Sequence, residues 1–245
     1  MQKLKLPRYG LSKYIDENKI KNAPKIDQQY INNLSIAGQR MMGFCMSTFF
    51  KRIDSSGYAF LLTLYRHALR NIVFIYAIEN KLKIPISDEN ALPDDFMEDD
   101  DQNQIPGLLH RDNILKEEKG KFSVSTDATL YQQVAKSYYD LISQKGGSSV
   151  KRLDSTYFKP SLKTQLKQDC EIIFEMIKLC GEWEIKDDKK LNELENLISQ
   201  KHKEEKVLVF TQYSDTAKYI YQQLKSRGVA AIGCVTGETQ NSTEI

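Results

Sequence analysis

Two short polar segments near the C-terminus carry the side chains that are best placed to meet a ligand. They are Thr211, Gln212 and Tyr213, and Thr236 and Gly237. Each segment follows an apolar run, at 207–210 and 229–235. Short apolar runs are typical of strands buried on both faces of a parallel sheet, and open parallel sheets bind ligands at the carboxyl ends of their strands. The pattern therefore indicates a ligand-facing edge, with an ordinary turn before a helix as the alternative.

A helix between the two runs would position these segments. Ser214 or Asp215 can cap its start by accepting hydrogen bonds from free backbone N–H groups, and the next apolar positions follow helical spacing. Gly228 suits the left-handed residue that ends many helices. The whole stretch predicts a strand–helix–strand unit, the building block of a parallel sheet.

The exact residues of this unit are more specific than its pattern of strands and helix. Lys206 to Ile220 reads KVLVFTQYSDTAKYI, and the second run ends in Val235-Thr236-Gly237. This sequence resembles motif IV and the segment that follows it in the second RecA-like lobe of superfamily 2 helicases, closest to the Swi/Snf-type group. The resemblance implies that both polar segments face the phosphate backbone of a bound strand, in a lobe that follows an ATP-binding lobe and later supplies an arginine finger.

Several earlier segments resemble the helical region between the two lobes in a bacterial branch of the same family. They are 40–60, 155–160 and 183–191. The resemblance spans most of the chain and is weakest over 84–125. Members of this branch are often fused to, or encoded with, nuclease and restriction functions, so it implies a nuclease as a further partner.

ATP hydrolysis by this chain alone is not expected. A phosphate-gripping loop needs the pattern GxxxxGK[ST], and Lys145-Gly146-Gly147-Ser148-Ser149 lacks it. No acidic box for magnesium follows a strand, and the sequence given ends soon after Thr236-Gly237, before the expected arginine finger. We therefore expect no cofactor in this chain, with ATP and magnesium bound by the intact motor.

Basic side chains on the helices give a second set of candidates. Lys51 and Arg52, and the trio Arg66, His67 and Arg70, could touch nucleic-acid phosphates. The alternative is a salt bridge to an acid such as Asp54, or plain exposure to solvent. The three histidines are too scattered for a metal site, and no strained turn surrounds a serine, so neither metal nor Ser–His chemistry is expected.

The fold class follows from the order of the patterns. Apolar residues recur at helical spacing over about 27–83, 127–145, 161–180 and 188–200, with a break favoured at 54–57. We expect a mixed connection over 108–124 and a loop over 148–159. Residues 87–107 form an acidic linker. We predict a mostly α chain with a C-terminal α/β piece: a helical inter-lobe region over 1–200 and an incomplete second RecA-like lobe over 201–245.

Composition sets the remaining limits. The 245 residues carry a net charge of only +2, and four cysteines without CxxC spacing are expected to be buried thiols in a reducing cytoplasm. The apolar stretch 60–78 is interrupted by two arginines, which favours a buried helix over a membrane span.

Two functions fit these observations. The first is part of an ATP-dependent DNA helicase or translocase of the Swi/Snf type, contributing inter-lobe coupling and DNA contacts. The second is a stand-alone helical module that docks on a separately encoded ATPase or nuclease.

Overall fold

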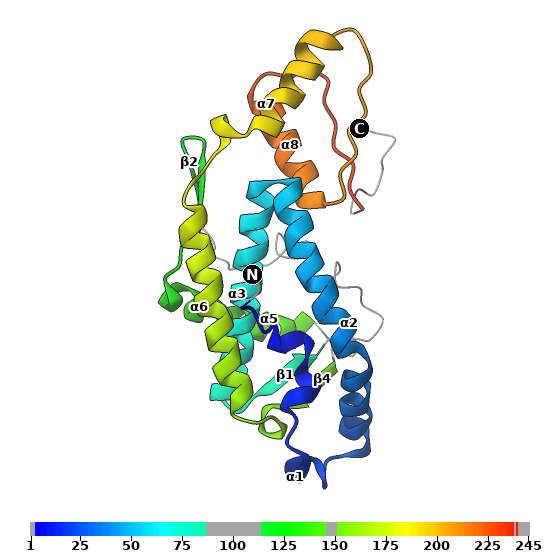
Figure 1. Ribbon diagram of the computed structural model, residues 1–245, viewed down its shortest axis with the longest axis vertical. Coiled ribbons are helices and arrows are strands. Elements are labelled where there is room, and N and C mark those ends of the chain that lie inside the picture. The colour runs from blue at the N-terminus through cyan, green and yellow to red at the C-terminus, as the bar shows by residue number, and fades with distance from the viewer. Residues whose placement is uncertain (1–2, 87–113, 146–150, 238, 240–245) are drawn as a thin grey trace.

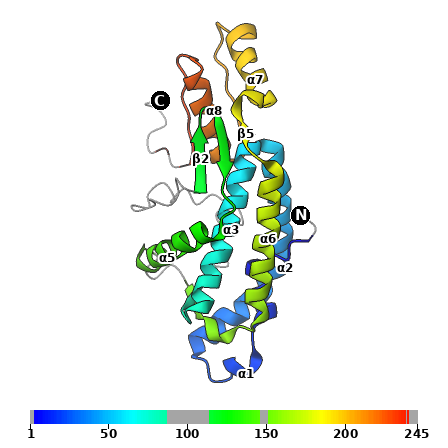
Figure 2. The ribbon, with the colours of Figure 1, turned by 90° about the vertical axis from the view of Figure 1, so that its left-hand side faces the viewer.

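The computed structural model describes residues 3–86, 114–145, 151–237 and 239. Most of this chain is helical, as predicted (Figure 1). The described α-helices are α1 (Glu17–Ile20), α2 (Lys25–Ser55), α3 (Gly57–Glu79), α5 (Ala128–Lys145), α6 (Ser161–Cys180), α7 (Lys189–Asn196) and α8 (Ser214–Ser226). Figures 1 and 2 show α2, α3 and α6 running along the long axis, with α7 and α8 at one end and α1 at the other. The predicted acidic linker, 87–107, lies outside the described residues.

Helix α3 is the centre of the core. Nearly every residue from Ala59 to Ala77 is buried, because α2, α5 and α6 all pack against it. A helix that is apolar on all sides must be covered on all sides. This explains why the stretch 60–78 resembles a membrane span in composition. Within the described part of the chain, no helix combines the length and apolarity needed to cross a membrane.

The predicted break after residue 54 is confirmed. Helix α2 ends at Ser55, and the Ser56 side chain accepts a hydrogen bond from the Ala59 N–H at 3.5 Å to cap α3. Gly57 begins α3 directly beneath an indole ring. A Cβ atom at Gly57 would lie 2.3 Å from Cζ3 of Trp183, so only glycine fits this contact without a shift.

The described strands form two small antiparallel sheets. Strand β1 (Lys83–Ile86) pairs with β4 (Lys151–Asp154), and β3 (Lys121–Val124) lies between β2 (Leu115–Glu118) and β5 (Trp183–Glu184). The prediction of a loop over 148–159 was therefore wrong at β4, and the mixed connection predicted over 108–124 contains β2 and β3. Each strand is only two to four residues long. Such strands are too short to show a clear alternation of apolar and polar residues.

The C-terminal unit matches its prediction only in part. Helix α8 forms as expected, but neither 207–210 nor 229–235 is assigned as a strand, and both run as coil beside α8 (Figure 1). Leu208 and Phe210 are 82% and 91% exposed. A strand buried on both faces requires paired neighbours and covering layers, and the described residues supply neither to 207–210.

Side-chain caps fix the other helix boundaries much as the sequence predicted. Asp127 accepts from the Thr129 N–H ahead of α5, and Asp188 accepts from the Leu191 N–H to cap α7. Gly181 ends α6 with a φ of 62°, in the region that favours glycine. These signals are local hydrogen-bonding and backbone preferences, so they can be recognised in the sequence without knowledge of the tertiary fold.

Candidate nucleic-acid interface

The segment before α8 presents two polar side chains to solvent and buries a third. Thr211 and Gln212 are exposed, whereas Tyr213 is 2% exposed and lies inside the protein. Tyr213 is also the residue that precedes α8, and it makes no side-chain cap. The expectation that Ser214 or Asp215 caps the helix was therefore wrong. Tyr213 anchors the segment, and only Thr211 and Gln212 are free to meet a ligand with their side chains.

Asp215 is held by two arginines from the helical body. Its Oδ2 accepts from Arg52 Nη1 at 2.7 Å and from Arg66 Nη1 at 2.5 Å, and its Oδ1 accepts from Arg66 Nη2 at 2.8 Å. Arg52 and Asp215 are separated by 163 residues in the sequence. This ion-pair cluster, Arg52–Asp215–Arg66, fastens the start of α8 to the hairpin formed by α2 and α3.

Burial makes this cluster sensitive to the loss of any member. The side chains of Arg52, Arg66 and Asp215 are 0%, 8% and 7% exposed. Burial alone would raise the pKa of Asp215, but the hydrogen bonds and charges of Arg66 and Arg52 outweigh it and hold that pKa below its ordinary value. Asp215 is therefore ionised at neutral pH and shares its single negative charge between the two buried cations.

Two further contacts strengthen the same junction. The guanidinium of Arg52 lies 3.9 Å from the centre of the Tyr213 ring, within the range of a cation–π interaction. The hydroxyls of Ser55 and Thr216 are 2.9 Å apart, which adds a hydrogen bond between the end of α2 and α8. Arg52 thus has all its described contacts inside the protein, and neither Arg52 nor Tyr213 faces solvent where a phosphate could reach it.

The remaining predicted contact residues lie at the surface. Lys51 is exposed on α2, Gly237 is exposed, and Thr236 is half-buried. The Thr236 N–H donates to Thr239 Oγ1 at 2.9 Å, and the Thr239 N–H donates to the Thr236 carbonyl at 3.0 Å, which makes a compact turn. Among the described residues, no hydrogen bond joins this turn to Thr211 or Gln212.

A second polar group ties the far side of α8 to the chain before it. The Tyr219 hydroxyl donates to Asp188 Oδ2 at 2.9 Å and lies 3.3 Å from Trp183 Nε1, which donates to it. Arg227 bonds Asn192 Oδ1 at 2.7 Å and Glu195 Oε2 at 2.5 Å. Trp183 thus packs over Gly57 and also contributes a hydrogen bond. Helix α8 is secured along its length.

No local pattern in the sequence indicates the partner of Arg52. Asp54 was a candidate because it is close in sequence, yet it is 92% exposed and pairs instead with Lys190. Asp215 was considered only as a cap. Within the part of the chain that the structure describes, no group of three or more His, Cys, Asp or Glu side chains could hold a metal ion.

Comparison with known proteins adds no relative from which a role could be transferred. No family model, no curated protein and no solved structure matches this chain.

Proposed function

We propose that this chain is part of an ATP-dependent DNA helicase or translocase of the Swi/Snf type, in which it joins a helical region to the start of the second RecA-like lobe. The observation that carries this proposal is the Arg52–Asp215–Arg66 cluster. It fastens the helix of the KVLVFTQYSDT segment to the two longest helices of the helical region. The sequence resemblance and the ion-pair cluster thus both support a boundary between the helical region and the start of the second lobe.

The cluster suits a part that transmits motion. Removing one partner of a buried ion pair typically costs about 3–5 kcal/mol, because a buried charge is left uncompensated. Opening the junction would separate these buried charges, so we expect α8 and the α2–α3 hairpin to move as one body. In the proposed motor, closure of the lobes on ATP would be passed through this body to the DNA.

The DNA contacts in this proposal come from Thr211, Gln212 and the turn at 236–237, with Lys51 as a charged addition. Hydroxyls, amides and backbone N–H groups are common partners of phosphate oxygens, and they position a protein on DNA without reading its sequence. In Figure 1 both segments run toward the end at which α8 begins. The burial of Tyr213 holds its exposed neighbours in place.

ATP and magnesium would be bound by other parts of the motor in this proposal. The ATP-binding lobe and the rest of the second lobe are therefore the first partners, with a nuclease as a further one. On its own, the chain is expected to bind DNA weakly and not to hydrolyse ATP.

A paired comparison of variants tests the contact residues. The double substitution Thr211→Ala with Gln212→Ala should weaken binding to duplex or single-stranded DNA about tenfold, measured by fluorescence anisotropy at low salt. The control is Thr129→Ala with Gln132→Ala, which removes the same side-chain types from exposed positions on α5. Equal affinity of the two double variants would remove Thr211 and Gln212 from the interface.

A second candidate function is favoured by the exposed apolar side chains. Leu208, Phe210 and Val235 are 82%, 91% and 56% exposed, which suits docking onto another protein as well as completion of a lobe. The chain would then be a helical module that docks on a separately encoded ATPase or nuclease. The DNA that flanks the coding region separates the two functions: helicase motifs in frame support the motor, and a native stop codon with its own promoter supports the module.

A further inference from the structure

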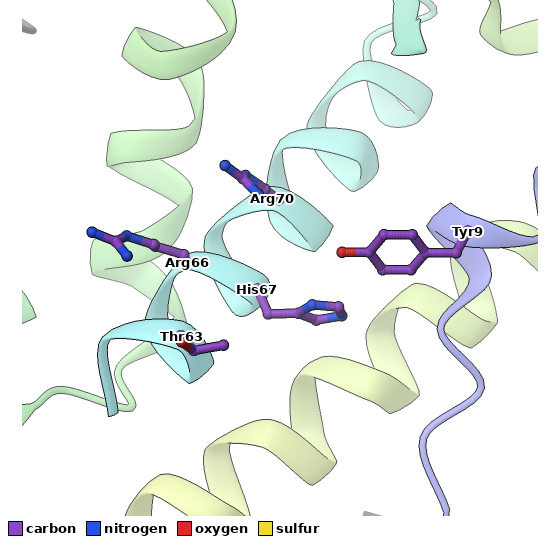
Figure 3. Close-up of a pocket in the computed structure, with 5 residues that line it drawn as sticks. All are labelled: Tyr9, Thr63, Arg66, His67 and Arg70. Carbon is purple, nitrogen blue, oxygen red and sulfur yellow. The ribbon is translucent and has the colours of Figure 1, made fainter. Parts of the chain in front are cut away.

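A small cavity between α3 and the N-terminal segment is lined by polar and cationic side chains (Figure 3). They are Tyr9, Thr63, Arg66, His67 and Arg70. Figure 3 shows the Tyr9 hydroxyl directed toward α3 and the His67 ring directed toward Tyr9. None of these residues belongs to the segments proposed to contact DNA, so this cavity requires its own explanation.

Arg8, next to the cavity, is a cation held by neutral groups. Its Nε donates to Asn71 Oδ1 at 2.7 Å, and its Nη2 lies 3.2 Å from His67 Nδ1. Among the described residues, no carboxylate lies within ion-pair distance of Arg8. Asp169 acts on it only from farther away, and both Asp169 oxygens already accept backbone N–H groups, from Lys5 at 2.9 Å and Leu6 at 2.7 Å.

The contact with Arg8 fixes the tautomer of His67. Burial, together with the charges of Arg8 and Arg70, lowers the pKa of His67 well below its ordinary value, so the ring is neutral at neutral pH. A guanidinium can only donate, so Nδ1 must accept and the ring proton must sit on Nε2. Nε2 is buried and has no hydrogen-bond partner among the described residues. His67 thus presents an N–H donor that lacks an acceptor.

Two of the other side chains that line the cavity already have partners. Thr63 uses its hydroxyl to donate to the Ala59 carbonyl at 2.9 Å, and Arg66 is paired with Asp215. Arg8 and Arg70 both place positive charge at His67. Buried donors are almost always satisfied in folded proteins, by protein atoms, water or a bound ion. An acceptor that carries negative charge fits these surroundings better than water does.

We propose that this cavity binds a small inorganic anion, such as a halide or one oxygen of a phosphate, beside His67 and Arg70. The space beside these side chains has room for a single water-sized group. Thr63 and His67 are each 2% exposed, so the phosphates of a DNA duplex would not reach the base of the cavity. The anion would accept the Nε2–H of His67 and balance the charge of Arg8, which would lock the N-terminal segment onto α3.

Thermal unfolding of the whole chain tests the proposal. Chloride or phosphate is titrated at constant ionic strength, with gluconate as the replacing anion because it is too bulky to enter. The midpoint temperature should rise along a saturating curve, as expected for a ligand that binds only the folded state. Arg70→Gln should raise the apparent Kd at least tenfold, whereas Arg152→Gln, a half-buried arginine on β4, should leave it unchanged. Identical curves for wild type and Arg70→Gln would overturn the proposal.

A direct measurement on the wild type does not depend on how the variants fold. The chloride-35 resonance should broaden in the presence of the protein and narrow again when bromide or phosphate displaces chloride. Absence of broadening overturns the proposal. Displacement by a short DNA duplex but not by inorganic phosphate also overturns it and assigns the cavity to nucleic acid. No DNA is needed for binding here, so failure of this test leaves the proposed motor function standing, and the converse holds.

Discussion

Apolar residues are buried in the helical body and exposed in the segment 207–210 of the C-terminal unit. In α3, Leu64 and Leu69 are 0% and 1% exposed, whereas Leu208 and Phe210 in the segment 207–210 are 82% and 91% exposed. A helix satisfies its backbone hydrogen bonds within itself, but a strand needs a neighbour. The difference teaches that apolar runs predict burial only when the partner that covers them is present. In the proposed motor, that partner is the remainder of the second lobe.

The largest expected effect comes from cutting the junction between the two regions. Asp215→Ala removes the carboxylate that pairs with the buried side chains of Arg52 and Arg66, so we expect the free energy of unfolding to fall by about 3–5 kcal/mol in urea denaturation. Asp54→Ala is the matched control, because Asp54 is 92% exposed and should change stability by less than about 0.5 kcal/mol. Equal effects of the two substitutions would contradict a buried junction.

The contrast in burial can be measured with one substitution in each region. Leu64→Ala should cost about 2–5 kcal/mol in the free energy of unfolding, because it removes buried methyl groups and opens a cavity in the core. Leu208→Ala should cost less than about 0.5 kcal/mol, because the side chain is already exposed. A large cost at Leu208 in urea denaturation would show that the segment 207–210 is covered in solution.

Substitutions at two glycines test the contact between Gly57 and Trp183. Gly57→Ala should destabilise by about 1–3 kcal/mol, since the new Cβ would collide with Trp183. Gly43→Ala should stabilise by about 0.5–1 kcal/mol, because Gly43 is exposed within α2 and nothing lies near its Cβ position. Thermal unfolding followed by circular dichroism measures both, and a shift of the same sign in the two variants would count against the Trp183 contact.

The smallest effect is a pH dependence of the junction. The pKa of Asp215 is lowered from its ordinary value of 3.8, so its contribution to stability is present above that pH and is lost as the pH falls through the folded-state pKa. The difference in free energy of unfolding between wild type and Asp215→Asn should therefore narrow between pH 5 and the lowest pH at which both remain folded. A constant difference across this range would show that folding does not lower the pKa of Asp215.

The helices of the fold could be predicted from the sequence because their signals are local. The break at Ser56, the Asp188 cap and the end of α6 at Gly181 each depend on residues within one turn. Strands β1 and β4 could not, since their pairing joins residues that are far apart in the sequence. Strands β2 and β3 pair around the two-residue turn Lys119-Gly120, so their signal was local and was missed. The runs at 207–210 and 229–235 carry strand composition, yet the described chain gives them no sheet to join.

The candidate site was predictable in its exposed part and not in its buried part. Thr211 and Gln212 lie at the surface, in line with the expectation of a ligand-facing edge. Arg52 and Tyr213 were expected beside them, but both are buried. Their true neighbour, Asp215, is set by the packing of α8 against the α2–α3 hairpin, and a contact across 163 residues leaves no trace in local spacing.

The salt dependence of DNA binding by the whole chain tests the proposed function most directly. Filter binding with duplex and single-stranded DNA, repeated over a series of salt concentrations, gives log Kd against log salt. The proposed contacts predict measurable affinity at low salt and a slope that becomes shallower by about 0.7–0.9 when Lys51 is changed to Ala, the loss of one phosphate contact, but not when the exposed Lys136 of α5 is changed. No binding at low salt, or a response that is flat in salt, would contradict the assignment of DNA contacts to this chain.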